Sequence, residues 1–180
     1  MIQGRRLVLR PIEEEDLPLI VRWQNHPEVW WYMDYERPFT LGDVREEEVR
    51  SRSEGYPLVV TVDGRPIGRI GLNRFRRRDR ICSLYLYIGE PAFWGQGYAR
   101  EALMVLLAHA FDRFDLHQVE LWTLAANSRV ISVYERCGFQ REASLRDRSF
   151  KDGRFFDHVV MSVTREEFNE AHEKYLAEES

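Results

Sequence analysis

Two glycines, Gly95 and Gly97, lie between an apolar segment that ends at Ile88 and a long amphipathic segment that begins near Tyr98. Glycine lets the backbone approach a ligand closely, and the first N–H groups of a helix attract an anion such as a pyrophosphate. Tight strand-to-helix turns that bind nothing have the same pattern. No Gly-Lys-Ser/Thr follows, so the segment is not a P-loop. It matches the dinucleotide fingerprint poorly, because the preceding strands are predicted to be antiparallel.

A second candidate segment reads Asn-Ser-Arg-Val-Ile-Ser-Val-Tyr-Glu-Arg-Cys-Gly-Phe and runs from Asn127 to Phe139. Tyr134 falls on a predicted short helix, where a lone tyrosine is most often a packing residue. A phenol is protonated at neutral pH, so within a binding site the same group suits general-acid catalysis. Asn127 lies at the end of a predicted strand, where it either forms an Asx turn or hydrogen-bonds a ligand.

Together the two segments resemble the GNAT superfamily of acetyl-CoA-dependent N-acetyltransferases. The first family motif is Arg/Gln-x-x-Gly-x-Gly/Ala, and the second is Asn-x-x-(Ser/Ala)-x-x-x-Tyr-x-(Lys/Arg)-x-Gly-Phe. Trp94 stands where the family usually has Arg or Gln, and the resemblance extends from Leu7 to Val163. It implies that acetyl-CoA is the acetyl donor and that backbone N–H groups of one turn hold its pyrophosphate. That turn comprises Gly95, Gln96, Gly97, Tyr98, Ala99 and Arg100.

The resemblance also assigns roles around the acetyl group. It implies that Leu86, Tyr87 and Ile88 pair with the pantetheine arm, and that the break at residues 89–91 splays two strands to admit it. Asn127 would hold the arm or a water, and Tyr134 would bind the donor and protonate the departing thiolate. The implied reaction is direct attack of an uncharged primary amine on the thioester in a ternary complex, with a backbone N–H stabilising the oxyanion.

The general base is left open by the sequence. Many relatives carry a glutamate on the fourth strand, but Leu84 occupies the matching position here. Glu90, Glu120 and Asp157 are alternatives that would act directly or through water, and each is equally consistent with a structural charge. We therefore assign no base from the sequence.

The acceptor prediction rests on an aromatic and acidic segment, with Trp31, Tyr32, Asp34 and Glu36 as predicted binding residues. Such a wall suits a cation, and the chain resembles the branch with ribosomal-protein N-terminal and spermidine/spermine acetyltransferases. A polyamine or other small cationic amine is the favoured acceptor. Phe75 and Leu84 stand where polyamine enzymes have acidic residues, so an amino sugar, an amino acid or a peptide N-terminus remains an alternative. A noncatalytic acyl-CoA-binding regulatory module is the alternative of another class.

The composition sets broader limits. The 180 residues are 44% hydrophobic, which predicts one domain over 1–180. The net charge of -4 argues against general nucleic-acid binding. With no apolar run near the roughly 20 residues that a membrane helix needs, we expect a cytoplasmic protein without membrane contact. The two cysteines and five histidines have no metal-ligand spacing, so no metal is predicted. The oligomeric state is open, a homo-oligomer included.

These residues must be positioned by an α+β fold. The periodicity predicts the order β-α-α-βββ-α-β-α-ββ-α, which fits the GNAT-like fold: a mixed, mostly antiparallel sheet, splayed at strands four and five, with helices on both faces. The predicted strands are 7–10, 56–62, 65–75, 80–88, 118–124, 140–147 and 154–163. The predicted helices are 14–24, 41–53, 97–114, 129–137 and a last one from 164, and 25–39 is predicted to be a loop with a short helix.

Overall fold

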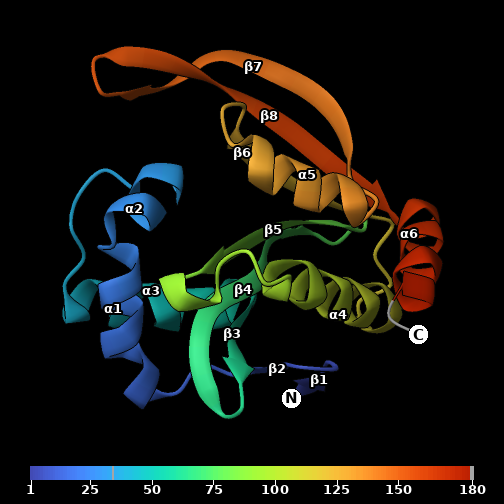
Figure 1. Cartoon of the computed structure of the whole chain (residues 1–180), viewed down its shortest axis with the longest axis horizontal. Coiled ribbons are helices and arrows are strands. Elements are labelled where there is room, and N and C mark those ends of the chain that lie inside the picture. The colour runs from blue at the N-terminus through green and yellow to red at the C-terminus, as the bar shows by residue number, and fades with distance from the viewer. Residues whose placement is uncertain (34, 179–180) are drawn as a thin grey trace.

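The computed structural model describes residues 1–33 and 35–178, which form one eight-stranded sheet (Figure 1). The strand order is β1-β2-β3-β4-β5-β6-β8-β7. Every neighbouring pair is antiparallel except β5 and β6, which are parallel. The strands are β1 (Ile2–Gln3), β2 (Val8–Arg10), β3 (Tyr56–Val62), β4 (Arg65–Arg76), β5 (Ile81–Ile88), β6 (Gln118–Leu124), β7 (Gln140–Lys151) and β8 (Arg154–Thr164).

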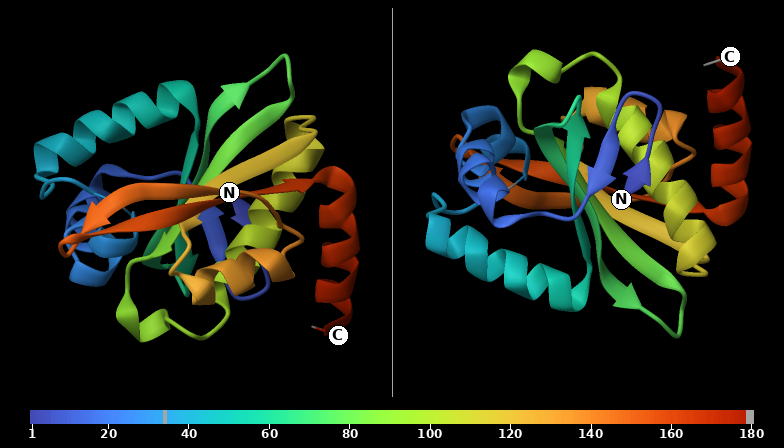
Figure 2. Two further views of the ribbon diagram at one scale, coloured as in Figure 1. Left: turned by 90° about the horizontal axis from the view of Figure 1, so that it is seen from above. Right: turned by 90° about the horizontal axis from the view of Figure 1, so that it is seen from below.

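Helices cover both faces of the sheet, as predicted (Figure 2). One face carries α1 (Leu17–Gln24), α2 (Pro27–Met33) and α3 (Leu41–Glu54), and the other carries α4 (Tyr98–Arg113) and α5 (Ser128–Arg136). The last helix, α6 (Arg165–Glu178), packs at one end of the sheet. The α+β class and the mostly antiparallel sheet with helices on both faces are therefore confirmed.

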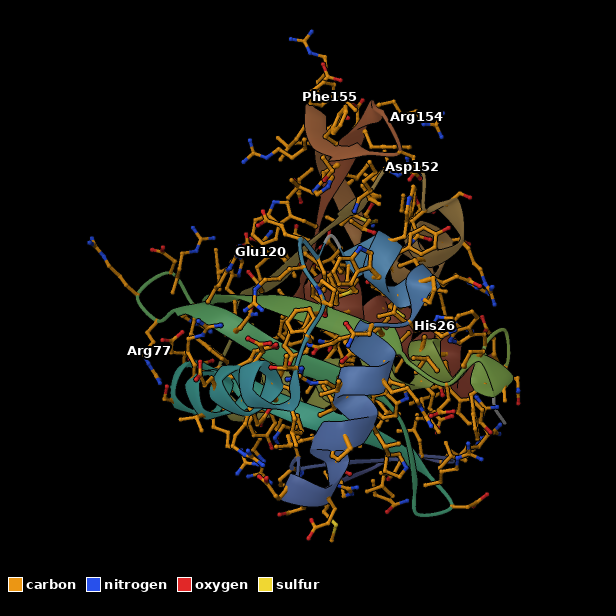
Figure 3. All side chains as sticks on the ribbon, turned by 90° about the vertical axis from the view of Figure 1, so that its left-hand side faces the viewer. His26, Arg77, Glu120, Asp152, Arg154 and Phe155 are labelled. Carbon is orange, nitrogen blue, oxygen red and sulfur yellow. The ribbon has the colours of Figure 1, made fainter. Side chains whose placement is uncertain are left out.

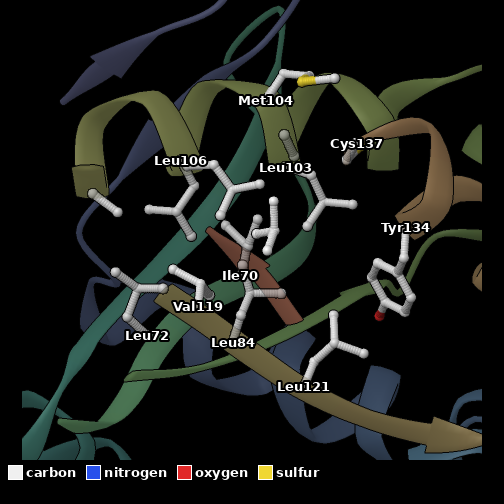
Figure 4. Close-up of a cluster of buried hydrophobic side chains, with 14 of the residues drawn as sticks. Ile70, Leu72, Leu84, Leu103, Met104, Leu106, Val119, Leu121, Tyr134 and Cys137 are labelled. Carbon is white, nitrogen blue, oxygen red and sulfur yellow. The ribbon is translucent and has the colours of Figure 1, made fainter. Parts of the chain in front are cut away.

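The local signals explain these elements. The α4 side chains that recur at helical spacing are buried against Ile70, Leu72 and Leu84 of the sheet (Figure 4). Helix α3 begins with a capping box, in which the Thr40 hydroxyl accepts from Asp43 N and the Asp43 carboxylate accepts from Thr40 N at 2.8 Å. The short helix expected within 25–39 is present over 27–33. One boundary differs from prediction: β7 continues to Lys151, because it pairs with Arg154 across the hairpin turn.

The splay between the fourth and fifth predicted strands is present. Strand β5 pairs with β6 only over 81–83 and 118–120, after which β5 follows β4 and β6 follows β8. The divergence thus begins at Leu84, before the break at residues 89–91 that was expected to cause it. That break has a packing role, since a Cβ built on Gly89 would lie 2.1 Å from Cγ of Trp23.

The β7–β8 hairpin extends past the sheet and leans toward α2 (Figure 1). The Trp31 indole Nε1 donates to Asp152 Oδ2 at the hairpin turn, 2.9 Å away. The Trp31 ring also meets the Phe156 ring edge to face at 5.3 Å. Helix α2 and the hairpin are therefore joined across the sheet face that α4 does not cover (Figure 3).

Candidate active site

The predicted pyrophosphate turn has the backbone that its glycines suggest. Gly95 (φ +77°) and Gly97 (φ +84°) are both left-handed, and Gly97 is the N-terminal cap of α4. The first turn of this helix therefore presents N–H groups without intrahelical acceptors toward the loop. Two guanidinium groups lie close to the same backbone: a Cβ built on Gly95 would be 3.1 Å from Arg129 Nη2, and one on Gly97 would be 3.3 Å from Arg6 Nη2.

Side chains of the turn hold it in place rather than face outward. Gln96 Nε2 donates to the Ala92 carbonyl at 2.5 Å, and the Gln96 carbonyl accepts from Arg6 Nη1 at 3.0 Å. The Arg6 guanidinium also lies 4.6 Å from the Tyr98 ring centre. Ala99 is half-buried in the first turn. Arg6 also forms an ion pair with the buried Glu101, whose Oε2 accepts from Arg6 Nε at 2.8 Å, so its charge is balanced within the protein. What the turn offers an anion is therefore its backbone, together with Arg129, which sequence reasoning missed because it lies in the second segment.

Arg100 differs from the other turn residues. Its side chain extends to the last helix, where Nη1 donates to Glu178 Oε2 at 2.5 Å, and it lies over the Tyr175 ring at 5.0 Å. Its guanidinium is thus committed to α6, and only its backbone N–H is placed in the first turn of α4.

The edge of β5 that faces the gap supplies the predicted pantetheine-binding residues. Leu86 and Ile88 pack toward the core under α4, whereas the Tyr87 side chain lies on the other face, with its ring edge-on to Trp23 at 6.5 Å. The three residues pair with β4 through Gly68, Arg69 and Ile70. Their opposite edge borders the gap, because β6 has already diverged.

Tyr134 lies on α5 above this gap. Its ring packs against Phe139 at 5.6 Å, and Figure 4 shows its hydroxyl directed toward the space between β5 and β6. Burial raises the pKa of Tyr134 far above the ordinary value, so the group is a neutral hydrogen-bond donor. Within residues 1–33 and 35–178 no protein group hydrogen-bonds this hydroxyl.

Asn127 has a structural role in the described chain. It caps α5 by accepting a hydrogen bond from Val130 N to Oδ1 at 3.4 Å, which is the Asx-type role that the sequence allowed. The cap fixes the start of the helix that carries Tyr134. Binding of the pantetheine arm by the Asn127 amide stays a prediction.

The three alternative bases all have structural partners. Glu90 accepts from Trp23 Nε1 at 2.8 Å and pairs with Arg22 and Arg65. Glu120 pairs with Arg76 at 3.3 Å, and Asp157 Oδ1 accepts from the Asp147 N–H at 2.9 Å.

Leu84, at the position of the family glutamate, is buried in the apolar core (Figure 4). The base therefore stays unassigned.

A cleft of about 460 Å³ opens where the strands diverge. Leu84 and Leu121 point into the core under α4, so Ser83, Tyr85 and Trp122, which alternate with them, face the other side. The residues that line the cleft come from β4, β5, β6 and the β7–β8 hairpin, namely Asn73, Arg74, Ser83, Leu84, Tyr85, Trp122, Leu145, Arg148 and His158. The sequence did not predict this cleft. Within it, Ser149 Oγ lies 2.6 Å from His158 Nε2.

Of the residues predicted to bind the acceptor, Trp31 and Tyr32 lie together near the cleft. Trp31 contacts Asp152 and Phe156 of the hairpin that lines the cleft, and Tyr32 lies edge-on to Trp31 at 4.9 Å. Glu36 is exposed in the segment after α2. Asp34 lies outside the described residues. A role for these residues in acceptor binding stays a prediction.

Other features of the described chain lie away from this site or are absent from it. A hollow of about 520 Å³ lies between His117 and α6, and none of its lining residues belongs to either motif. No helix among residues 1–33 and 35–178 has both the length and the apolar composition to span a bilayer. The same stretches hold no group of three His, Cys, Asp or Glu residues arranged as metal ligands.

Known proteins share both the sequence and the fold. The acetyltransferase (GNAT) domain family matches residues 6–140. Spermidine N(1)-acetyltransferase of Escherichia coli K12 is 26% identical over 175 residues, covering 96% of this chain and 93% of the relative. A Bacillus subtilis relative whose name assigns it to ribosomal N-acetylation is 26% identical, covering 89% of this chain and 91% of its own. The structure of Vibrio cholerae spermidine N-acetyltransferase with CoA and spermine has TM-score 0.85 at 24% identity, covering 91% of this chain and 98% of that one.

Proposed function

The chain belongs to the GNAT acetyltransferase family, and from that premise we propose that it transfers the acetyl group of acetyl-CoA to a primary amine. The observation that carries the proposal is the placement of Tyr134, which directs a neutral phenol toward the gap between β5 and β6. The glycine turn at the end of β5 borders the same gap, and so does the 460 Å³ cleft, which we call the acceptor-side cleft.

The donor would lie along β5. Its pyrophosphate would accept hydrogen bonds from the backbone of the turn, with Arg129 supplying positive charge, because the charge of Arg6 is balanced by Glu101. Its pantetheine arm would run along the β5 edge from Ile88 toward Leu84, a span of about 13 Å at the usual rise of a strand. The Vibrio cholerae relative, whose structure contains CoA, supports this choice of donor.

The chemistry is a direct acyl transfer. The amine nitrogen attacks the thioester carbon, the carbon–sulfur bond breaks, and the sulfur leaves as a thiolate. Tyr134 gives its hydroxyl proton to that thiolate, and the proton lost by the amine restores the phenol through solvent. A backbone N–H on the free edge of β5 would stabilise the oxyanion.

The acceptor would enter from the cleft on the face opposite α4, so donor and acceptor meet in the gap as a ternary complex. The spermidine relatives make polyamines the first amines to assay, and an amino sugar, an amino acid or a peptide N-terminus follows. The test is release of free CoA from acetyl-CoA across this panel. Binding of acetyl-CoA without release in the presence of any amine would indicate a noncatalytic acyl-CoA-binding module instead.

A further inference from the structure

Two arginines from separate strands point into the acceptor-side cleft. Arg74 comes from β4 and Arg148 from β7, and both line the cleft beside Trp122. The Arg74 guanidinium lies 5.3 Å from the Trp122 ring centre. Within residues 1–33 and 35–178 neither guanidinium is paired with a carboxylate. The cleft is thus lined by two guanidinium groups whose positive charge no carboxylate among the described residues balances.

A β-bulge places Arg74 in the cleft. Between the pairs Asn73–Ser83 and Arg76–Ile81, β4 advances three residues while β5 advances two. Regular alternation from Leu72, which is in the core, would put the Arg74 side chain into that core. Instead Arg74 has φ +49° and Phe75 packs against the core, so the extra residue transfers Arg74 to the other face.

A second irregularity lies in the hairpin, beside Arg148. From Leu145 to Ser149, β7 advances four residues while β8 advances only from His158 to Phe156. Asp147, next to Arg148, has φ +52°. Left-handed backbone at a residue other than glycine costs about 1–2 kcal/mol, and such strain collects at functional sites. A left-handed residue thus lies at Arg74 and next to Arg148, the two arginines that line the cleft.

The other charged groups near the cleft do not supply the missing partner. Glu120 is held by Arg76, and Asp157 accepts from the backbone of Asp147. His158 contacts Ser149, and Lys151 lies over the Trp31 ring at 5.7 Å. The electrostatic potential in the cleft is therefore positive near Arg74 and Arg148.

We propose that the acceptor amine also carries a carboxylate, which Arg74 and Arg148 bind while the amine reaches the acetyl group in the gap. Guanidinium groups bind carboxylates in a planar, two-point geometry, and Trp122 would contact the carbon chain between the two ends. The proposal rests on the proposed acetyltransferase function and specifies its substrate class. It favours an amino acid or a free-carboxylate peptide over a polyamine.

The experiment compares matched amines that differ only in a carboxylate or its carboxamide, at several separations from the amine, together with spermidine. We expect the wild type to prefer the carboxylate member of at least one pair. Arg74→Gln and Arg148→Gln should each raise the KM for that amine about tenfold, the usual loss for a charge-assisted hydrogen bond, with kcat and the KM for acetyl-CoA unchanged. Arg74→Lys should recover part of the affinity through its charge alone.

Arg77→Gln is the matched control, because Arg77 projects from the β4–β5 turn and does not line the cleft (Figure 3). The proposal is overturned if both cleft variants behave like this control, or if carboxamides and spermidine are used as well as carboxylates. A second readout is independent of turnover: calorimetry with a carboxylate that lacks the amine, on protein saturated with CoA. If no amine releases CoA, the proposed function fails, while loss of carboxylate binding in the variants still decides the arginine site.

Discussion

The indole Nε1 of Trp94 donates a hydrogen bond to the carbonyl oxygen of Ile88 at 2.7 Å. This bond ties the glycine turn back to the last residue of β5, and the Trp94 ring meets His26 edge to face at 5.6 Å. The residue that departs from the family motif therefore fixes the angle between the β5 edge and the turn.

Trp94→Phe keeps the ring and removes this donor. A hydrogen bond contributes about 0.5–1.5 kcal/mol, so we expect the Kd for acetyl-CoA to rise about three- to tenfold by calorimetry. Trp122→Phe, which removes an indole N–H from the cleft and not from the turn, should leave that Kd unchanged. Equal affinities in all three proteins would show that Trp94 does not set the turn.

Gly97→Ala tests the backbone of the turn. Both Gly97 (φ +84°) and Gly64 (φ +76°) are left-handed, and a Cβ on Gly64 meets nothing within 4 Å. Each alanine variant should therefore lower the free energy of unfolding by about 1 kcal/mol. Only Gly97→Ala should also weaken acetyl-CoA binding, because its methyl group would project from the turn proposed to hold the pyrophosphate, 3.3 Å from Arg6 Nη2. If Gly64→Ala weakens binding equally, the loss reflects stability rather than the site.

Tyr134→Phe removes only the hydroxyl. We expect kcat to fall about 100-fold, at the lower end for loss of a general acid, with the Kd for acetyl-CoA unchanged. Tyr56→Phe removes a phenol near His109, away from the gap, and should retain full activity. A kcat for Tyr134→Phe close to that of wild type would assign Tyr134 to packing and leave protonation of the thiolate to water.

The pH dependence follows from the burial of Tyr134, which raises the pKa of its phenol. The folded state favours the neutral form, so this group stabilises the fold fully below the unfolded pKa of about 10, and the contribution is lost as pH rises beyond it. Wild-type kcat should therefore show no alkaline decline below about pH 10. The difference in unfolding free energy between wild type and Tyr134→Phe should change only above that pH.

Glu90→Gln separates a structural carboxylate from a general base. The substitution removes the ion pairs to Arg22 and Arg65, which are exposed, so we expect a loss of only about 1 kcal/mol in unfolding free energy. The amide oxygen can still accept from Trp23 Nε1. The acid limb of the pH–rate profile should be unchanged, and its disappearance would identify Glu90 as the base.

The sequence predicted the parts of the site that local patterns encode. The glycine turn is visible as a change from strand to helical periodicity, and Tyr134 is fixed by its position on a nine-residue helix. The acceptor side was not predictable in the same way. A bulge that shifts the alternation by one residue moves Arg74 to the opposite face, and hydropathy does not reveal the shift. Contacts such as Trp31 with Asp152 join residues 121 positions apart.

The short pairing between β5 and β6 also bears on how the protein opens. Among residues 1–33 and 35–178, three ladder pairs and the hydrogen bonds of His117 N and Gln118 N to the Arg80 carbonyl join the backbones of β5 and β6, so the ladder between the two halves of the sheet is short. Amide hydrogens on either side of the gap should therefore exchange through separate opening events in the free protein. A donor that lies along β5 would bridge the halves, and exchange at 84–88 and 121–124 should then slow together. During each catalytic cycle, the two halves of the sheet would therefore open together while the donor is bound and separately after CoA has left.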